Sequence, residues 1–200
     1  MKITIYKLNN KLNDEQICTY EESRLINNSV QLNDNFSFAP SSHKLIVKSQ
    51  AVREILDFIE WDIGERRDNR VEQGGILIGN RFFDAEQDIH YAVVTKALTA
   101  DNAIGSATHL NITPDCWNTL HEEKDAYNLE TGQENVIIGW FHTHPNRLSC
   151  FMSGTDRDTQ KRFFPGENTY SIVINPQRHL MKAFRSKECF ATQAFFLFED

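Results

Sequence analysis

One stretch constrains this chain more than any other: Gly139 to Asp156, which reads GWFHTHPNRLSCFMSGTD. The apolar run that leads into it, Val136 to Phe141, is short and rich in residues that favour strands. Side chains two residues apart on a strand point to the same face, so His142 and His144 are expected to project together. Pro145 lacks an amide hydrogen, so strand pairing should end directly after the two histidines.

The end of the same stretch predicts the start of a helix. Ser153 is typical of an N-cap, and Asp156 falls in the first turn on the same side. Two imidazoles and a carboxylate that converge in this way suit zinc, with His142, His144 and Asp156 as ligands. Three ligands leave the fourth tetrahedral position to water, which is the pattern of a catalytic site. Asp158 is a rival ligand, but helical spacing turns it away from the Ser153 side.

A reacting zinc-bound water needs a base, and a second stretch supplies a candidate. Residues 71 to 79 read VEQGGILIG, where two glycines before an apolar run predict a tight entry into a buried strand. Glu72 lies at the mouth of that strand. Both observations have plainer interpretations. Paired histidines at a strand end can be structural, and a glutamate in a loop is usually solvated.

Taken together, Glu-x-Gly-Gly-x-Leu-x-Gly and His-x-His-Pro-x7-Ser-x2-Asp resemble the JAMM signature of MPN-type metalloproteases. The resemblance covers residues 44 to 185 and fills every signature position. It implies an α/β (α+β) fold: a single MPN-type, cytidine-deaminase-like α/β/α domain, with a mixed sheet flanked by helices. It also implies one zinc per chain and cleavage of the amide bond after the C-terminus of a ubiquitin-like protein.

The resemblance assigns a role to each signature residue. The family's zinc ligands correspond to His142, His144 and Asp156, its general base to Glu72, and its oxyanion-stabilising hydroxyl to Ser153. Many MPN-type domains lack these residues and serve only as scaffolds. Because this chain keeps the whole set, a catalytically inactive scaffold is the weakest of the functional alternatives.

Two enzymatic functions share this catalytic set. The first is an isopeptidase or peptidase of a bacterial conjugation system, like compact members of the JAB branch, some of which are antiviral. Its partners would be a ubiquitin-like protein or its conjugates and the E1-like and E2-like enzymes of the same system. The second is a sulfur-carrier hydrolase that releases an amino acid from a small ubiquitin-fold carrier. The genes that neighbour this one would separate the two.

Substrate contacts are expected where an extended modifier tail could add to a strand edge near the motif. Residues 101–108 and 146–152 flank that path, and they make Arg147 and Phe151 the candidate contacts. The alternative is that Phe151 packs inward and Arg147 is solvated. The small terminal residues of the tail are expected beside Trp140 or His142.

Composition excludes other classes of protein. The net charge is −7 and Lys and Arg form no dense run, which argues against a nucleic-acid partner. No apolar stretch reaches the roughly 18 residues of a membrane span, and no signal peptide is visible. Cys18, Cys116, Cys150 and Cys189 are widely spaced without a CxxC pair, so they are interpreted as the reduced thiols of a cytoplasmic protein.

The pattern predicts one core domain, residues 44–200, after an N-terminal extension, residues 1–43, that packs on the core or recognises a partner. Hydrophobic spacing and capping residues predict helices over 49–65, 113–128 and 153–163. Strands are expected over 1–8, 44–47, 74–83, 89–97, 107–112, 136–141, 170–174, 180–185 and 190–198, with 101–106 as a loop.

Overall fold

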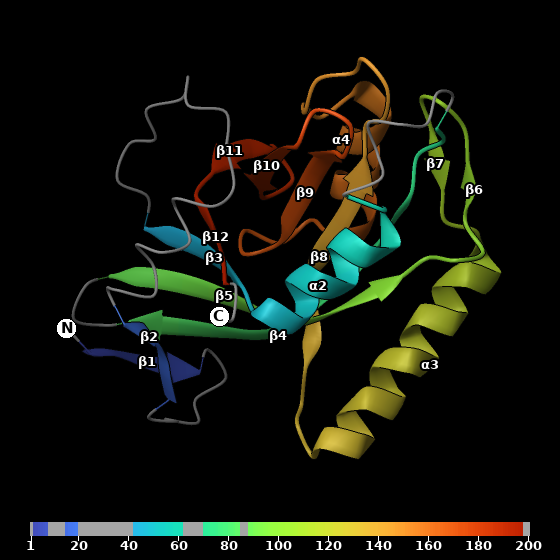
Figure 1. Ribbon diagram of the computed structural model, residues 1–200. Helices are drawn as coiled ribbons and strands as arrows, with labels where there is room; N and C mark the ends of the chain where they lie inside the picture. The colour runs from blue at the N-terminus through green and yellow to red at the C-terminus, as the bar shows by residue number, and fades with distance from the viewer. Residues whose placement is uncertain (1, 8–14, 20–41, 62–69, 85–87, 198–200) are drawn as a thin grey trace.

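The computed structural model describes residues 2–7, 15–19, 42–61, 70–84 and 88–197 (Figure 1). Its helices are α2 (Ser49–Phe58), α3 (Pro114–Thr131) and α4 (Gly154–Phe163). The strands of its main sheet are β1 (Lys2–Lys7), β2 (Glu15–Thr19), β3 (His43–Val47), β4 (Gly74–Asp84), β5 (Ile89–Thr99), β8 (Val136–Thr143), β9 (Tyr170–Asn175), β10 (Leu180–Arg185), β11 (Phe190–Thr192) and β12 (Ala194–Phe196). A separate two-stranded hairpin consists of β6 (Ile104–Gly105) and β7 (Leu110–Asn111).

The main sheet is mixed, with the order β11-β10-β9-β8-β4-β5-β3-β12. Strand β8 lies at its centre, antiparallel to β4 and parallel to β9. Strands β3, β5 and β12 form the other parallel pairs. The sheet therefore places the end of β8, where the sequence motif begins, between the ends of two well-paired strands.

Apolar side chains pack on both faces of this sheet. On β4, Leu77 belongs to one buried cluster, whereas its neighbours Ile76 and Ile78 belong to another, as alternation along a strand requires. The first cluster includes residues of α2, and the second includes residues of α3 and those that flank α4. Figure 1 shows the helices arranged around the sheet in this way. The predicted α/β/α architecture with a mixed sheet is confirmed.

Helix ends follow local capping chemistry. Thr113 accepts a hydrogen bond from the Cys116 amide, Pro114 occupies the first turn, and α3 ends at a left-handed Gly132, as its sequence favours. Helix α2 is shorter than the predicted 49–65. Glu60 adopts a φ of 52°, and Trp61 N–H bonds back to the Leu56 carbonyl, which is the pattern of a Schellman stop. Residues 62–69 lie outside the described part of the chain.

Other segments also differ from prediction. The expected strand 190–198 divides into β11, which pairs with β10, and β12, which pairs with β3. The expected loop 101–106 contains β6, and the expected strand 107–112 contains only the short β7. The two strands close a hairpin in which the Ser106 amide bonds to the His109 carbonyl at 2.7 Å. Within the predicted extension, β1 pairs with β2 and adds to β4 through Tyr6 and Lys7. Most of residues 8–41 lies outside the described part of the chain.

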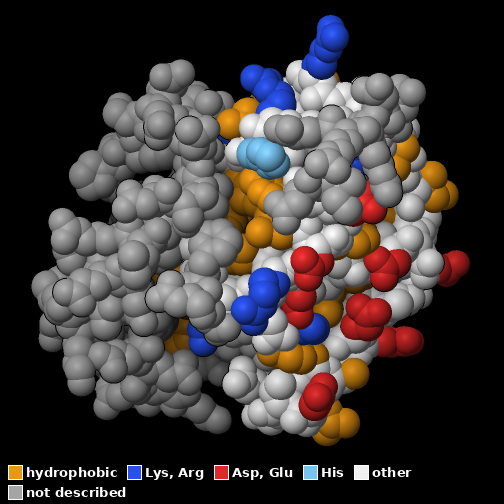
Figure 2. Space-filling model, in the orientation of Figure 1, with side chains coloured by type: hydrophobic (Ala, Val, Ile, Leu, Met, Phe, Trp, Pro, Cys, Tyr) orange, Lys and Arg blue, Asp and Glu red, His pale blue; other side chains and the backbone are white. Residues whose placement is uncertain are grey.

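Acidic side chains gather on the face that Figure 2 shows, over the region between α2 and α3. A groove of about 730 Å³ there is lined by Glu54, Asp57, Glu123 and Glu130. Its one lysine, Lys96, is held by Glu54 at 2.7 Å. This groove is therefore an unfavourable site for a polyanion such as nucleic acid. No helix in the described residues has the length and apolar character needed to cross a membrane.

Candidate metal centre

The end of β8 and the start of α4 bring two histidines and an aspartate together. Among the described residues, His142, His144 and Asp156 form one group whose ligand atoms all lie within 4.8 Å of one another. His142 Nε2 and His144 Nε2 are 3.2 Å apart. Each lies 3.3 Å from an oxygen of Asp156. All three residues are buried, so the polar group is enclosed in the fold rather than spread on a surface.

These separations match the requirements of a small tetrahedral cation. In a tetrahedral site with bonds of about 2.05 Å, neighbouring ligand atoms are about 3.3 Å apart. Two buried imidazole nitrogens and a carboxylate are also a typical zinc donor set. Without a cation, two facing imidazole nitrogens could form only one hydrogen bond between them. The residues present therefore fit a metal ion in both geometry and chemistry.

Hydrogen bonds orient two of the three side chains. His144 Nδ1 lies 2.9 Å from the Ser149 carbonyl, which leaves Nε2 to face the group. Asp156 Oδ2 accepts the Ser153 amide at 2.7 Å, and Ser153 Oγ accepts the Asp156 amide at 3.2 Å. This reciprocal capping box at the start of α4 is the helix start predicted from the sequence. It fixes the Asp156 carboxylate in the first turn of α4.

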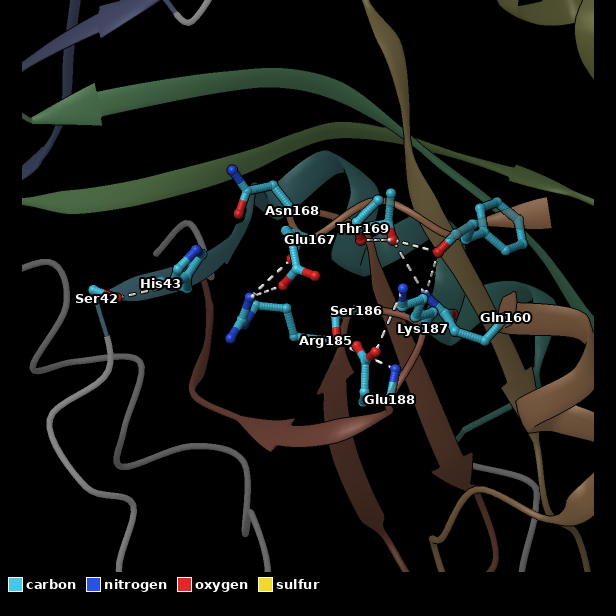
Figure 3. A network of polar contacts seen from close by, with 12 residues as sticks. Ser42, His43, Gln160, Glu167, Asn168, Thr169, Arg185, Ser186, Lys187 and Glu188 are labelled. Atoms are coloured by element: carbon cyan, nitrogen blue, oxygen red, sulfur yellow. Dashed lines mark hydrogen bonds and ion pairs between the residues drawn. The ribbon is translucent and has the colours of Figure 1, made fainter. Parts of the chain in front are cut away.

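His142 is held differently. Its ring stacks on Trp140, with centroids 4.3 Å apart and planes 12° apart. The Trp140 indole N–H donates to Gln160 Oε1 at 2.7 Å. Gln160 is fully buried, and its Nε2 donates to the Phe164 carbonyl and to Thr169 Oγ1 (Figure 3). A chain of contacts thus connects His142 to the far end of α4.

The buried charges shift the pKa values of the group. Burial lowers the pKa of His142, and Asp156 opposes this effect only in part. At His144 burial also lowers the pKa, but hydrogen bonds to Asp156 and to the Ser149 carbonyl outweigh this effect and leave the pKa raised. Burial alone would raise the pKa of Asp156, but hydrogen bonds with both histidines lower it well below its usual range. Asp156 is therefore an anion at neutral pH.

Glu72 lies beside this group and is not solvated. It is only 4% exposed, so the ordinary fate of a loop glutamate does not apply. Burial raises its pKa to about 7; the charge of His144 lowers it, and that of Asp156 raises it further. Its amide donates to the Ser106 carbonyl of the hairpin at 2.7 Å. A Cβ at Gly105 would overlap the Glu72 carbonyl oxygen, so the hairpin packs flat against this backbone.

The remaining predicted residues fall around the group. Ser153 is half-buried at the N-cap, whereas the rival ligand Asp158 is exposed and lies outside the metal group. Arg147 lines a cavity of about 730 Å³ together with Ala107 and Thr108, so the two segments expected to flank the substrate path do meet. Phe151 is 44% exposed and lies edge-on to the His144 ring, with centroids 5.1 Å apart.

Trp140 and the three described cysteines are all buried. Trp140 is buried under the Phe164 and His142 rings, so it offers no surface to a substrate tail, contrary to prediction. The cysteines whose side chains are described, Cys116, Cys150 and Cys189, are free and buried. Cys150 is no ligand: its thiol bonds to the Leu180 carbonyl, and burial raises its pKa to about 11.

Sequence reasoning missed two residues that shape the site. Gln160 anchors Trp140 from inside α4, and nothing distinguishes it in the sequence from a solvated helical glutamine. Asn146 follows the histidine pair with a φ of 62°. Asparagine after a strand-ending proline is a signal for a left-handed turn residue, and that signal could have identified it.

A mixed sheet between helices, with a two-histidine, one-aspartate group at the end of its central strand, defines the class of domain. The model of the JAB1/Mov34/MPN/PAD-1 ubiquitin protease family matches residues 40–164, and the chain belongs to this family. The match includes Glu72, His142, His144, Ser153 and Asp156.

Several curated relatives share part of this domain. A 26S proteasome non-ATPase regulatory subunit 14 of Drosophila melanogaster is 35% identical over 48 residues, or 24% of this chain and 15% of that protein. COP9 signalosome complex subunit 5b of Arabidopsis thaliana is 32% identical over 75 residues, or 37% of this chain and 20% of that protein. COP9 signalosome complex subunit 5 of Oryza sativa subsp. japonica is 28% identical over 88 residues, or 44% of this chain and 24% of that protein. The chain thus matches less than a quarter of the length of each.

Proposed function

We propose that this protein is a JAMM-type zinc metallopeptidase that cleaves the amide bond after the C-terminus of a ubiquitin-like protein. One observation carries the proposal: a buried carboxylate with a pKa of about 7, Glu72, interacts electrostatically with a His-His-Asp group that fits a tetrahedral cation. A base poised near neutrality beside a three-ligand metal group suits hydrolysis, because three ligands leave a position for water. The family to which the chain belongs supplies the substrate class.

The roles follow from the chemistry of each group. When bound by His142, His144 and Asp156, zinc would lower the pKa of a water molecule toward neutrality and polarise the scissile carbonyl. Glu72, which becomes ionised as the pH rises through about 7, would accept a proton from the attacking water and then pass it to the leaving amine. The burial that raises its pKa also makes its protonated form a competent acid. A single carboxylate can therefore serve both steps.

Ser153 has a hydroxyl hydrogen free for the transition state. Its Oγ uses a lone pair to accept the Asp156 amide, so the cap does not consume the O–H donor. As attack proceeds, negative charge grows on the carbonyl oxygen, and a preorganised donor at that point stabilises it. Such a donor is worth on the order of 3 kcal/mol.

Substrate would enter between the hairpin and the loop after the two histidines. Arg147 and Thr108 line one cavity there, and the exposed Phe151 edge lies against the His144 ring. We assign Arg147 and Phe151 to substrate contact because both are exposed, Arg147 in this cavity and Phe151 against the His144 ring. The short strands β6 and β7 offer backbone groups to which an extended tail could pair.

We further propose that the modifier belongs to a bacterial conjugation system, with its E1-like and E2-like enzymes as partners. The bacterial setting rests on the resemblance to compact JAB-branch members. The relatives named above, which are subunits of the proteasome and the COP9 signalosome, and the ubiquitin protease family model support the ubiquitin-like substrate alone. Genes for activating and conjugating enzymes beside this one would support the assignment. Sulfur-assimilation genes in their place would contradict it.

The direct test is a cleavage assay. The zinc-loaded protein is incubated with ubiquitin and with each ubiquitin-like protein that its source organism encodes, each fused at its C-terminus to a reporter. We expect one fusion to be cut after the last modifier residue, cutting to stop when the metal is chelated, and zinc to restore it. Zinc-loaded protein that cuts none of the fusions, or chelated protein that cuts as fast, would contradict the proposal.

A further inference from the structure

The segment that bears Glu72 is tied to the segment that bears the histidines by a side chain outside the sequence signature. Asn146 Nδ2 donates to the Arg70 carbonyl at 3.1 Å, and Asn146 Oδ1 accepts the Arg70 amide at 3.3 Å. The amide group of one side chain thus pairs with the backbone of Arg70 as a neighbouring strand residue would. Arg70 precedes Glu72 by two residues, and Asn146 follows His144 by two.

Asn146 is itself held from several directions. Its backbone has a φ of 62°, which asparagine tolerates better than most residues. Gln177 accepts the Asn146 amide through Oε1 and donates to Asn146 Oδ1 from Nε2 at 3.2 Å. Asn175 Nδ2 donates to the Asn146 carbonyl at 3.2 Å and to the Leu148 carbonyl at 2.6 Å. Asn146 is therefore a fixed point against which another segment can be positioned.

A second tie lies on the other side of the base. The Gln73 amide donates to Thr143 Oγ1, and the Thr143 amide donates to the Gln73 carbonyl, both at 2.8 Å. Glu72 is thus bracketed by Arg70 on one side and by Gln73 on the other. Because Gly74 already pairs with His142 in the sheet, the Gln73 tie extends an existing ladder. The Arg70 tie depends on the Asn146 side chain.

We propose that Asn146 is a positioning residue that fixes the base-bearing segment relative to the metal ligands. The role of Glu72 as base comes from the proposed function, whereas the pairing of Asn146 with Arg70 stands independently of it. A general base must lie within hydrogen-bond reach of the proton it removes. A displacement of about 1 Å can cost about a hundredfold in rate. Loss of the tie should therefore lower the catalytic rate without changing the chemistry of the ligands.

Two substitutions distinguish the role of the Asn146 side-chain amide from that of its left-handed backbone conformation. Asn146→Gly removes both hydrogen bonds to Arg70 but keeps the left-handed conformation at little cost. Asn146→Asp keeps an acceptor for the Arg70 amide and loses the donor. The matched control is Asp88→Gly, another left-handed residue with a φ of 54°, exposed in the turn before β5. It lies at the opposite end of β5 from the metal group.

We expect kcat on the fastest-cut modifier fusion to fall at least tenfold in Asn146→Gly and less in Asn146→Asp, with KM within twofold and one zinc per chain retained. Asp88→Gly should match wild type. A KM increase at constant kcat would make Asn146 a substrate contact, and loss of zinc would make it a support for the ligands alone. Either result, or unchanged kinetics, would overturn the inference.

Amide hydrogen exchange tests the tie without any substrate. The Arg70 amide should exchange at least tenfold faster in metal-loaded Asn146→Gly than in wild type, and no faster in Asp88→Gly. Unchanged exchange would overturn the inference even if activity fell. If the wild-type protein cuts no fusion, the proposed function fails. Faster exchange in Asn146→Gly would then still establish the tie.

Discussion

The indole ring of Trp140 lies nearly parallel to the imidazole of His142, with centroids 4.3 Å apart. Metal-bound histidines usually donate their second ring nitrogen to a neighbouring acceptor, as His144 does to Ser149. The buried His142 Nδ1 has no hydrogen-bond partner among the described residues. Stacking on Trp140, with Gln160 holding the indole, therefore takes over the orientation of this ligand.

Disrupting this support should weaken metal binding. We expect Trp140→Leu and Gln160→Leu to raise the dissociation constant for zinc about tenfold or more, the usual range for a lost support of a ligand. Trp140→Phe keeps an aromatic face, so its dissociation constant for zinc should lie between those of the wild-type protein and Trp140→Leu. Phe163→Leu, an exposed position at the end of α4, is the control. Competition with a chromogenic chelator measures the affinity. Equal affinity in all four variants and wild type would rule out the support role.

Glu72→Gln should keep the fold and the metal but lose at least about a hundredfold in kcat, the scale of a positioned base. In the wild-type protein the carboxylate must be ionised to accept a proton, and its pKa is raised to about 7. Activity should therefore fall as the pH drops below about 7 and level off above it. The pH dependence of kcat/KM measures this loss of activity at low pH. A flat profile between pH 5 and 8 would place the base elsewhere.

Ser153 is expected to act twice, in catalysis and in capping. Ser153→Ala should lower kcat about a hundredfold through the lost donor and cost about 1 kcal/mol of stability through the lost cap. Ser153→Thr keeps a hydroxyl that can donate and cap the helix, so it should retain most of the wild-type kcat and most of the wild-type stability. Kinetics and thermal melting measured on the same samples separate the two effects. If Ser153→Ala melts at a lower temperature but retains full kcat, its role is structural only.

Arg147→Ala and Phe151→Ala should each raise KM for the modifier fusion and leave kcat and zinc content unchanged, which is the pattern of lost ground-state binding. Both side chains are exposed, so neither substitution should disturb the core. Arg185→Ala, whose guanidinium pairs with Glu167, changes the same charge elsewhere and serves as the control. Unaltered KM in both test variants would move substrate recognition to another face.

Features governed by local chemistry could be predicted from the sequence. The Ser153–Asp156 capping box needs only the residue types and their spacing, and the structure contains it. Likewise, Thr113 and Pro114 define the start of α3 without help from the rest of the fold. The continuous apolar run from Ile76 to Ile78 was sufficient to predict a buried strand, and the structure packs β4 on both faces.

Features that depend on distant contacts could not be predicted in this way. The burial of Glu72 arises from the hairpin, where Ser106 binds its amide, and the few apolar residues of that hairpin give its two short strands a weak signal. One final strand was expected over 190–198, but the chain forms β11 and β12 there, and the place of β12 beside β3 depends on topology. Local propensity also carried the helix prediction past Glu60, whose left-handed conformation ends α2.

The central claim is that His142, His144 and Asp156 together hold one zinc ion. Metal analysis of the purified protein and of His142→Ala, His144→Ala and Asp156→Ala tests it most directly, with Asp158→Ala as the control for a neighbouring carboxylate. We expect one zinc per chain in the wild-type protein and in Asp158→Ala, and a sharp loss in each of the other three variants. Full zinc occupancy in those three variants would contradict it.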